Sequence, residues 1–175
     1  MKKRILIFGF FVFVVNVYAF DIKKPSSIDY FVGYGEGKLE RQPDYQFPIF
    51  AIDFSYPLSD GWDFQLEPFV SYVYKPEDNF EVGLAFFFKY NFFRNKRISP
   101  YIKGGSGIIY ISQDTYEQST NFNFVDQICG GIKFSFKKNI IFLEYRYRHI
   151  SNAGIDHPNS GINSNLYLFG ISHPF

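Results

Sequence analysis

Two consecutive stretches of the chain alternate apolar and polar residues over an unusual length. From Trp62 to Tyr74, and again from Phe80 to Phe92, aromatic and aliphatic residues recur at every second position for most of the stretch. A period of two places those residues on one face of an extended strand. Strands of globular proteins usually have about five or six residues, whereas a tilted membrane strand needs roughly ten. The alternation therefore predicts strands long enough to cross a membrane.

Counting all extended stretches gives eight predicted strands. They are expected near residues 27–37, 46–56, 62–75, 79–92, 98–112, 122–136, 140–151 and 163–175. Three connections are tight turns, and the intervening ones, residues 38–45, 113–121 and 152–162, are longer loops, except that the connection at residues 76–78 is short. An even strand number with short turns at one end and longer loops at the other is typical of outer-membrane barrels. The expected fold class is all-β, an eight-stranded antiparallel transmembrane β-barrel of the outer-membrane type.

The first nineteen residues have the pattern of a secretory signal peptide. Met1–Arg4 is basic, Ile5–Val15 is apolar, and the sequence Val17-Tyr18-Ala19 fits a signal-peptidase site. The apolar run is shorter than the roughly 20 residues that a bilayer-spanning helix needs. We therefore expect residues 1–19 to be removed and residues 20–175 to form an integral barrel in the bacterial outer membrane.

Composition narrows the classes of partner. The formal net charge is +1, which gives no support for a nucleic-acid partner. Aromatic residues make up 22% of the chain, as expected for a lipid-facing wall around a polar interior. Eight strands enclose room for side chains only, so no water-filled pore is expected. Three histidines and one cysteine without metal-ligand spacing predict no metal site. The alternative at this point is a soluble, aromatic-rich extracellular β-protein.

Near the end of the seventh predicted strand, His149 and Ser151 form a candidate base and nucleophile. Residues two apart on a strand point to the same side, and this pair continues the outward apolar row of Tyr145 and Tyr147. A serine hydroxyl is a weak nucleophile until an adjacent imidazole accepts its proton. A base and a nucleophile on the outside of a barrel fit a lipid substrate. Taken alone, the pair also fits two interfacial residues of a non-catalytic barrel.

The residues around this pair resemble the active-site segment of the PagL-type lipid A 3-O-deacylases. The resemblance covers residues 80–175 and rests on the segments 98–107, 122–134, 149–154, 158–159 and 161–162, whereas residues 26–79 agree in strand count only. It implies an eight-stranded outer-membrane barrel whose serine-hydrolase site faces the outer leaflet. The implied substrate is lipid A or lipopolysaccharide, and no cofactor is implied.

Carried over position by position, the resemblance makes Ser151 the nucleophile and His149 its general base. It also makes Asn152 and Asn159 candidates for holding the oxyanion through side-chain amides or backbone donors. The alternative for both asparagines is turn chemistry, because asparagine favours loops and left-handed backbone.

Two residues are candidates for the group that orients His149. Asn163 stands where the family has a glutamate; an asparagine accepts the imidazole N–H but cannot offset the imidazolium charge. Asp126 lies on an otherwise apolar row of the sixth strand, and a tight hairpin would bring it beside His149 or Ser151. A lipid-facing carboxylate without a partner is unfavourable, so Asp126 is a second candidate for the missing charge.

The leading expectation is an outer-membrane serine esterase that removes an acyl chain from lipid A. Two alternatives stay open: a non-catalytic small barrel with an adhesive or structural role, and an acyltransferase that passes the chain to another lipid. The expected partners are lipid A and the surrounding outer-membrane lipid, with a homodimer as a further option.

Overall fold

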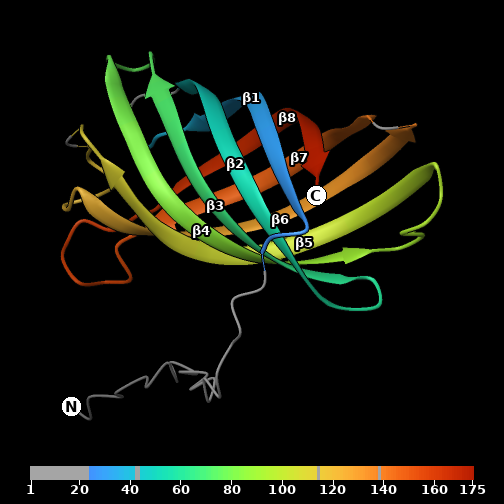
Figure 1. The fold of residues 1–175 in the computed structure, drawn as a ribbon. Helices are drawn as coiled ribbons and strands as arrows, with labels where there is room; N and C mark the ends of the chain where they lie inside the picture. Colours follow the sequence, from blue (N-terminus) through green and yellow to red (C-terminus); the bar gives the residue numbers. More distant parts are fainter. Residues whose placement is uncertain (1–23, 42–43, 114, 138) are drawn as a thin grey trace, which may run out of the picture.

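The computed structural model describes residues 24–41, 44–113, 115–137 and 139–175. Over these residues the chain forms one closed antiparallel barrel in which β1 pairs with β8 (Figure 1). The strands are β1 (Ser27–Lys38), β2 (Tyr45–Ser59), β3 (Trp62–Val73), β4 (Asn79–Asn91), β5 (Ile98–Ile111), β6 (Phe122–Phe136), β7 (Asn139–Ser151) and β8 (Ile162–Pro174). The predicted eight-stranded barrel is confirmed, with strand ends shifted by a few residues. The expected signal peptide, residues 1–19, lies outside the described residues.

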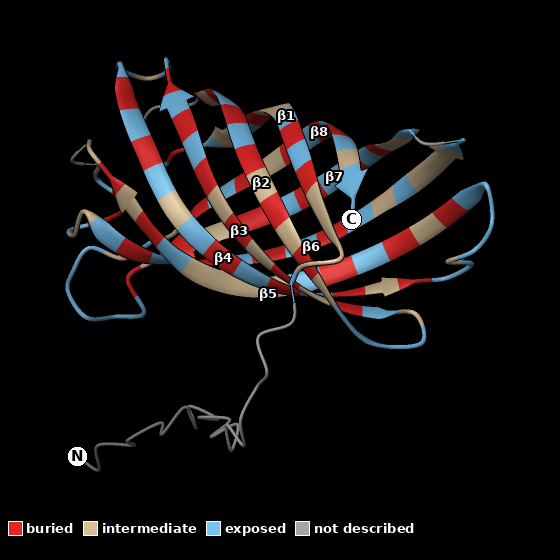
Figure 2. Cartoon of the chain, viewed as in Figure 1, coloured by how far each residue is buried: buried red, intermediate tan, exposed pale blue. Residues whose placement is uncertain are grey.

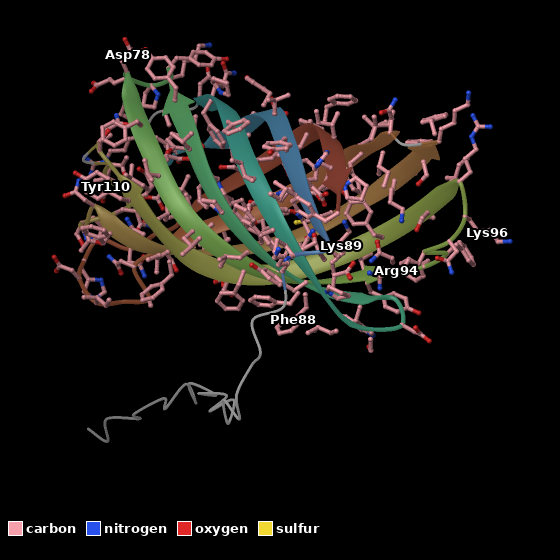
Figure 3. The ribbon with its side chains drawn as sticks, viewed as in Figure 1. Asp78, Phe88, Lys89, Arg94, Lys96 and Tyr110 are labelled. Carbon is pink, nitrogen blue, oxygen red and sulfur yellow. The ribbon has the colours of Figure 1, made fainter. Side chains whose placement is uncertain are left out.

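Burial alternates along most of each strand, as the period of two predicts (Figure 2). On β4, Phe88 is 49% exposed and its neighbour Lys89 is 4% exposed. Figure 3 shows the same pair pointing to opposite sides of the wall, Phe88 outward and Lys89 inward. The outward row of aromatic and aliphatic side chains gives the barrel an apolar outer surface. No helix among the described residues is long and apolar enough to cross a bilayer.

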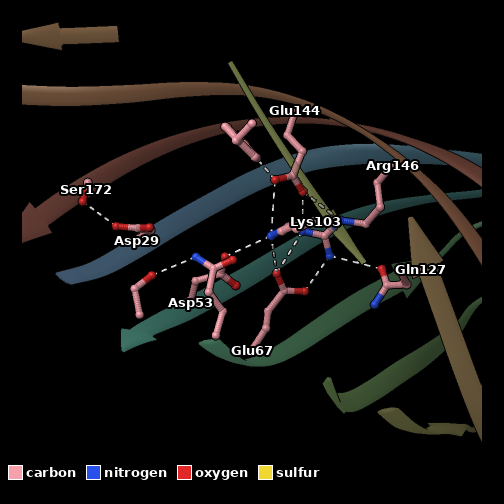
Figure 4. A network of polar contacts seen from close by, with 11 residues as sticks. Asp29, Asp53, Glu67, Lys103, Gln127, Glu144, Arg146 and Ser172 are labelled. Atoms are coloured by element: carbon pink, nitrogen blue, oxygen red, sulfur yellow. Dashed lines mark hydrogen bonds and ion pairs between the residues drawn. The ribbon is translucent and has the colours of Figure 1, made fainter. Parts of the chain in front are cut away.

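Buried charged side chains fill the middle of the barrel (Figure 4). Arg146 donates to both carboxylate oxygens of Glu67, at 2.5 and 2.9 Å, and lies 2.7 Å from Glu144. Lys103 lies 3.0 Å from Asp53 and 3.2 Å from Glu144. Removing a charge from water is unfavourable unless an opposite charge is close, and here each charge has such a partner. We call these five side chains the inner network.

Apolar side chains complete the interior. Among the buried apolar residues are Phe69, Phe87, Val125 and Cys129. A separate buried ion pair, outside the inner network, joins Arg148 to Glu81 at 2.7 Å, and Tyr45 donates to the same carboxylate at 2.6 Å. Side chains therefore occupy the lumen, as expected for a barrel of eight strands.

The connections divide between the two ends of the barrel as predicted. In Figure 3, Arg94 and Lys96 of the β4–β5 turn lie at one end, and Asp78 and Tyr110 lie at the other. The long β5–β6 and β7–β8 loops emerge at this second end (Figure 1). Because β7 runs toward them, its last residues lie beside these loops.

Candidate active site

The outer face of β7 carries His149 and Ser151 at the end that meets the long loops. Both are half-buried, and the residue between them, Ile150, is fully buried in the interior. The strand alternation therefore places the imidazole and the hydroxyl on the outside of the barrel wall. Among the described residues no hydrogen bond joins these two side chains, and Ser151 lies opposite Phe124 of β6. Contacts between base and nucleophile are often loose before substrate binds.

Strand register brings three polar residues into one row across the wall. Asp126 of β6 pairs with His149 of β7, and His149 pairs with Asn163 of β8. Asp126 and Asn163 are exposed, so all three share the outer face. The predicted hairpin between β6 and β7 therefore has the register that the sequence required. We call Asp126, His149 and Asn163 the outer polar row.

Asn163 contacts the imidazole directly. Its Oδ1 lies 2.8 Å from His149 Nδ1. With Oδ1 as the acceptor, Nδ1 carries the ring hydrogen and Nε2 keeps its lone pair. An imidazole in this tautomer accepts a proton at Nε2, which is what a general base for a serine requires.

A glycine makes room for the imidazole. Gly161 precedes β8 and has φ of +80°, a conformation that side chains with a Cβ rarely adopt. A Cβ at this position would lie 2.6 Å from His149 Cε1 and 3.4 Å from Nε2. The loop therefore approaches the imidazole closely because residue 161 has no side chain. The sequence indicated Gly161 only as part of a motif, not as a neighbour of His149.

Asp126 has another partner. Ser106 of β5 donates its hydroxyl to Asp126 Oδ1 at 2.5 Å. In the part of the chain that the structure describes, no ion pair joins Asp126 to His149. Register places the two residues side by side, but the carboxylate is directed toward β5. In this geometry Asn163, rather than Asp126, is the group that contacts the imidazole.

The two asparagines of the β7–β8 loop differ in whether a hydrogen-bond donor remains free to bind an oxyanion. Asn152 is fully buried, and its Nδ2 donates to Ser119 Oγ at 3.2 Å and to the Asp156 carbonyl at 3.0 Å. Its backbone N–H donates to Asn159 Oδ1 at 2.9 Å. Both donors of Asn152 therefore organise the loop, as turn chemistry predicts. Among the described residues no acceptor pairs with Asn159 Nδ2, so this amide is the donor that remains.

The sequence did not predict that the β5–β6 loop supports the site. Ser119 N donates to the Pro158 carbonyl at 3.1 Å, and Ser160 N donates to the Glu117 carbonyl at 3.0 Å. These bonds join the two long loops through the residues on either side of Asn159, and they therefore fix the position of Asn159 in the β7–β8 loop. Hydrogen bonds between loops depend on irregular backbone geometry, which leaves no periodic pattern in the sequence. The sequence therefore could not predict this contact.

Tyr147 is a second feature that the sequence did not assign. Its hydroxyl donates to Asn163 Oδ1 at 2.8 Å, the same oxygen that contacts His149. The alternation placed Tyr147 on the outer face but could not show that its side chain reaches diagonally to β8.

Among the described residues no cluster of histidine, cysteine or carboxylate side chains has the arrangement of a metal site.

A shallow apolar hollow lies on the outer wall, separated from the outer polar row by the row of Ile128, Tyr147 and Asn165. Its volume is about 730 Å³, and it spans β1, β6, β7 and β8. Gly130 is exposed within it, and a Cβ there would meet no atom within 4 Å. The side chains of Val32, Leu143, Tyr145 and Phe169 line the hollow. The strands β6, β7 and β8, which carry the outer polar row, thus also form an apolar hollow further along the wall.

Comparisons with known proteins point to one family and one fold. The sequence profile of the lipid A 3-O-deacylases (PagL) matches residues 44–172. The crystal structure of the outer membrane enzyme PagL is similar, with a TM-score of 0.59 and 21% identity over 85% of this chain and 99% of that chain. No curated protein sequence matches the chain.

Two further outer-membrane barrels share the architecture at lower sequence identity. Neisserial surface protein A superposes with a TM-score of 0.66 and 13% identity, over 85% of this chain and 96% of that chain. The outer membrane protein OprG from Pseudomonas aeruginosa gives 0.52 and 13%, over 87% of this chain and 98% of that chain. At these identities the likeness concerns the fold.

Proposed function

The chain belongs to the lipid A 3-O-deacylase (PagL) family, and we propose that it hydrolyses an ester-linked acyl chain of lipid A with Ser151 as nucleophile and His149 as base. Its family and its closed barrel with an apolar outer wall make it an integral protein of the bacterial outer membrane. The observation that carries the proposed mechanism is the bond between His149 Nδ1 and Asn163 Oδ1. That bond leaves Nε2 able to accept a proton on the face that carries Ser151.

The reaction divides into two steps. In the first, His149 Nε2 accepts the Ser151 proton while Oγ attacks the ester carbonyl, and the resulting tetrahedral oxyanion collapses as the C–O bond to the sugar breaks. The leaving sugar oxygen takes the proton from His149, and the acyl group stays on Ser151. In the second step His149 deprotonates a water molecule, which attacks the acyl-enzyme, and a free fatty acid leaves as Ser151 regains its proton.

Asn163 takes the place of the acid of a triad in this proposal. Its Oδ1 accepts the Nδ1 hydrogen and so selects the tautomer, but it brings no negative charge to stabilise the imidazolium. Asp126 is not assigned a role in the reaction, because its carboxylate accepts a hydrogen bond from Ser106. Sites of the Cys-His-Asn type use the same neutral orienting group.

Asn159 is the proposed donor to the oxyanion. Its Oδ1 is held by the backbone N–H of Asn152, which fixes the orientation of the amide and leaves Nδ2 as a donor. A donor that is fixed before the reaction stabilises the developing charge without reorganisation. Asn152 contributes indirectly, by holding the loop in the shape that positions Asn159.

The outside of the barrel is the only side on which a lipid can meet these groups. The inner network and the ion pair of Arg148 and Glu81 fill the lumen, so a bulky amphiphile has no path through it. The proposed reaction does not require a second copy of the chain, and the homodimer has no support from the fold or the comparisons.

Mass spectrometry of lipid A from cells that express the chain tests this function. We expect the lipid to lose the mass of one acyl chain, and we expect Ser151→Ala to abolish that loss while the barrel still assembles. An unchanged mass with the wild-type chain would favour the non-catalytic barrel. A gained chain would favour the acyltransferase. Retention of deacylation by Ser151→Ala would remove the proposed nucleophile.

A further inference from the structure

Two hydrogen-bond donors converge on one amide oxygen beside the proposed base. Tyr147 Oη donates to Asn163 Oδ1 at 2.8 Å, and His149 Nδ1 lies 2.8 Å from the same atom. In the strand register Asn163 pairs with His149, whereas Tyr147 pairs with Asn165. The phenol therefore reaches diagonally across the ladder to contact the residue that orients the imidazole.

An asparagine in this position creates a problem that a carboxylate does not have. The two oxygens of a carboxylate are equivalent acceptors, but the two ends of an amide are an acceptor and a donor. If the amide rotates by half a turn, Nδ2 faces His149, Nδ1 must accept, and the ring hydrogen moves to Nε2. An imidazole protonated at Nε2 cannot accept the Ser151 proton. In a serine triad, asparagine in place of the aspartate lowers kcat about 10⁴-fold through the wrong tautomer.

We propose that Tyr147 is a positioning residue that holds the Asn163 amide with its oxygen toward His149. The inference rests on the proposed function. Oδ1 has two lone pairs, and the two donors occupy both. With the amide reversed, the phenolic hydrogen of Tyr147 would lose the acceptor that it has in this structure. The orientation that satisfies Tyr147 is thus the one that leaves His149 Nε2 free to act as a base.

The same strand contains a matched control. Tyr145 donates to Asn165 Oδ1 at 2.6 Å, with the same side-chain types and the same diagonal reach between β7 and β8. Asn165, however, pairs with Tyr147 and has no histidine beside it in the register. Removing the hydroxyl of Tyr145 deletes an equivalent bond without affecting the amide that contacts His149.

The first test compares Tyr147→Phe with Tyr145→Phe in the purified protein in detergent, with release of fatty acid from lipid A as the assay. For Tyr147→Phe we expect kcat to fall at least about tenfold, up to the roughly 10⁴-fold effect of a fixed wrong tautomer, with KM unchanged. For Tyr145→Phe we expect kcat within about twofold of the wild type, since the Asn165 amide that Tyr145 contacts does not touch His149. Equal effects of the two substitutions would overturn the inference.

The second test uses the symmetry of a carboxylate. In an Asn163→Asp background the orienting group cannot be reversed, so Tyr147→Phe should lower kcat less than about threefold there. If Tyr147→Phe lowers kcat as much in this background as it does with Asn163, Tyr147 contributes by contacting the substrate or by packing on the outer wall, and the inference fails.

The third test does not depend on activity. Nitrogen NMR of the His149 ring, at a pH where the imidazole is neutral, should show the hydrogen on Nδ1 in the wild type and a shift toward Nε2 in Tyr147→Phe. A tautomer that stays on Nδ1 in the variant overturns the inference even if Ser151→Ala is inactive. Conversely, loss of the proposed nucleophile role would leave this result unchanged, so the two failures are distinguishable.

Discussion

The two faces of β7 hold polar side chains in opposite ways. On the inner face, Arg146 and Arg148 are fully buried, and each lies within 2.7 Å of a carboxylate oxygen. On the outer face, His149 contacts a neutral amide, and the Ser151 hydroxyl has no hydrogen bond among the described residues. Each inner arginine is paired with a carboxylate. On the outer face, by contrast, the Nε2 lone pair of His149 and the hydroxyl of Ser151 have no partner among the described residues. The charges of the inner face are therefore all paired, and the outer face carries the groups that we propose to react.

Replacing His149 with alanine should separate these roles most sharply. We expect His149→Ala to lower kcat by about 10⁴-fold or more, because the proposed nucleophile loses its base. Unfolding in detergent should be nearly unchanged, since the imidazole is half-buried and makes one hydrogen bond to an exposed amide. The rate of fatty acid release and the midpoint of thermal unfolding measure the two effects. A loss of stability comparable to that of an inner-face variant would contradict the division between the faces.

The adjacent residue should show the reverse pattern. We expect Arg148→Met to lower the free energy of unfolding by about 3–5 kcal/mol, because the Glu81 carboxylate stays buried without its partner. The folded fraction should retain its kcat, because Arg148 points away from the outer polar row. Denaturant titration measures the first effect, and activity per folded molecule measures the second.

A double variant provides the control for Arg148. Adding Glu81→Gln removes the unpaired charge, so most of the lost stability should return. If the double variant is as unstable as Arg148→Met, the damage comes from packing rather than from the buried charge. If the folded fraction of Arg148→Met is inactive, the two faces are coupled and the comparison fails.

The sequence predicted the side on which each residue lies, and it was less informative about what each residue contacts. Alternation placed His149 on the outer face, and because a strand has a strict period of two the adjacent Arg148 must lie on the inner face. It also placed Asp126 beside His149 through the length of the β6–β7 turn, and the register agrees. The signal peptide and the roles of the site residues stay predictions.

Contacts that run diagonally or between loops had no such signal. The reach of Tyr147 to Asn163, the approach of Gly161 to His149 and the bond from Ser119 to Pro158 all depend on rotamers or on loop backbone. These are fixed by tertiary packing, and residues of the same type occur elsewhere on the wall without those contacts. Tyr145 makes the same kind of diagonal bond, to Asn165, but Asn165 has no histidine beside it, so the residue type alone does not mark the site.

The smallest expected effect concerns the carboxylate of the outer polar row. Asp126 accepts a hydrogen bond from Ser106 and is exposed, whereas the inner carboxylates are buried and paired with cations. We expect Asp126→Asn to change kcat by less than about threefold, since an amide oxygen also accepts the Ser106 hydroxyl and Asn163 already orients His149.

The measurement is kcat for fatty acid release, with Ser106→Ala as the companion variant. If the carboxylate turned toward His149 when substrate binds, Asp126→Asn would lose tenfold or more, and Ser106→Ala, which frees the carboxylate, would not. That result would mean that Asp126 supplies the negative charge for His149 and that Asn163 only assists in orienting the imidazole. An unchanged kcat in both variants would mean that the outer face works with a neutral orienting group, and that the charges of β7 belong to the inner face alone.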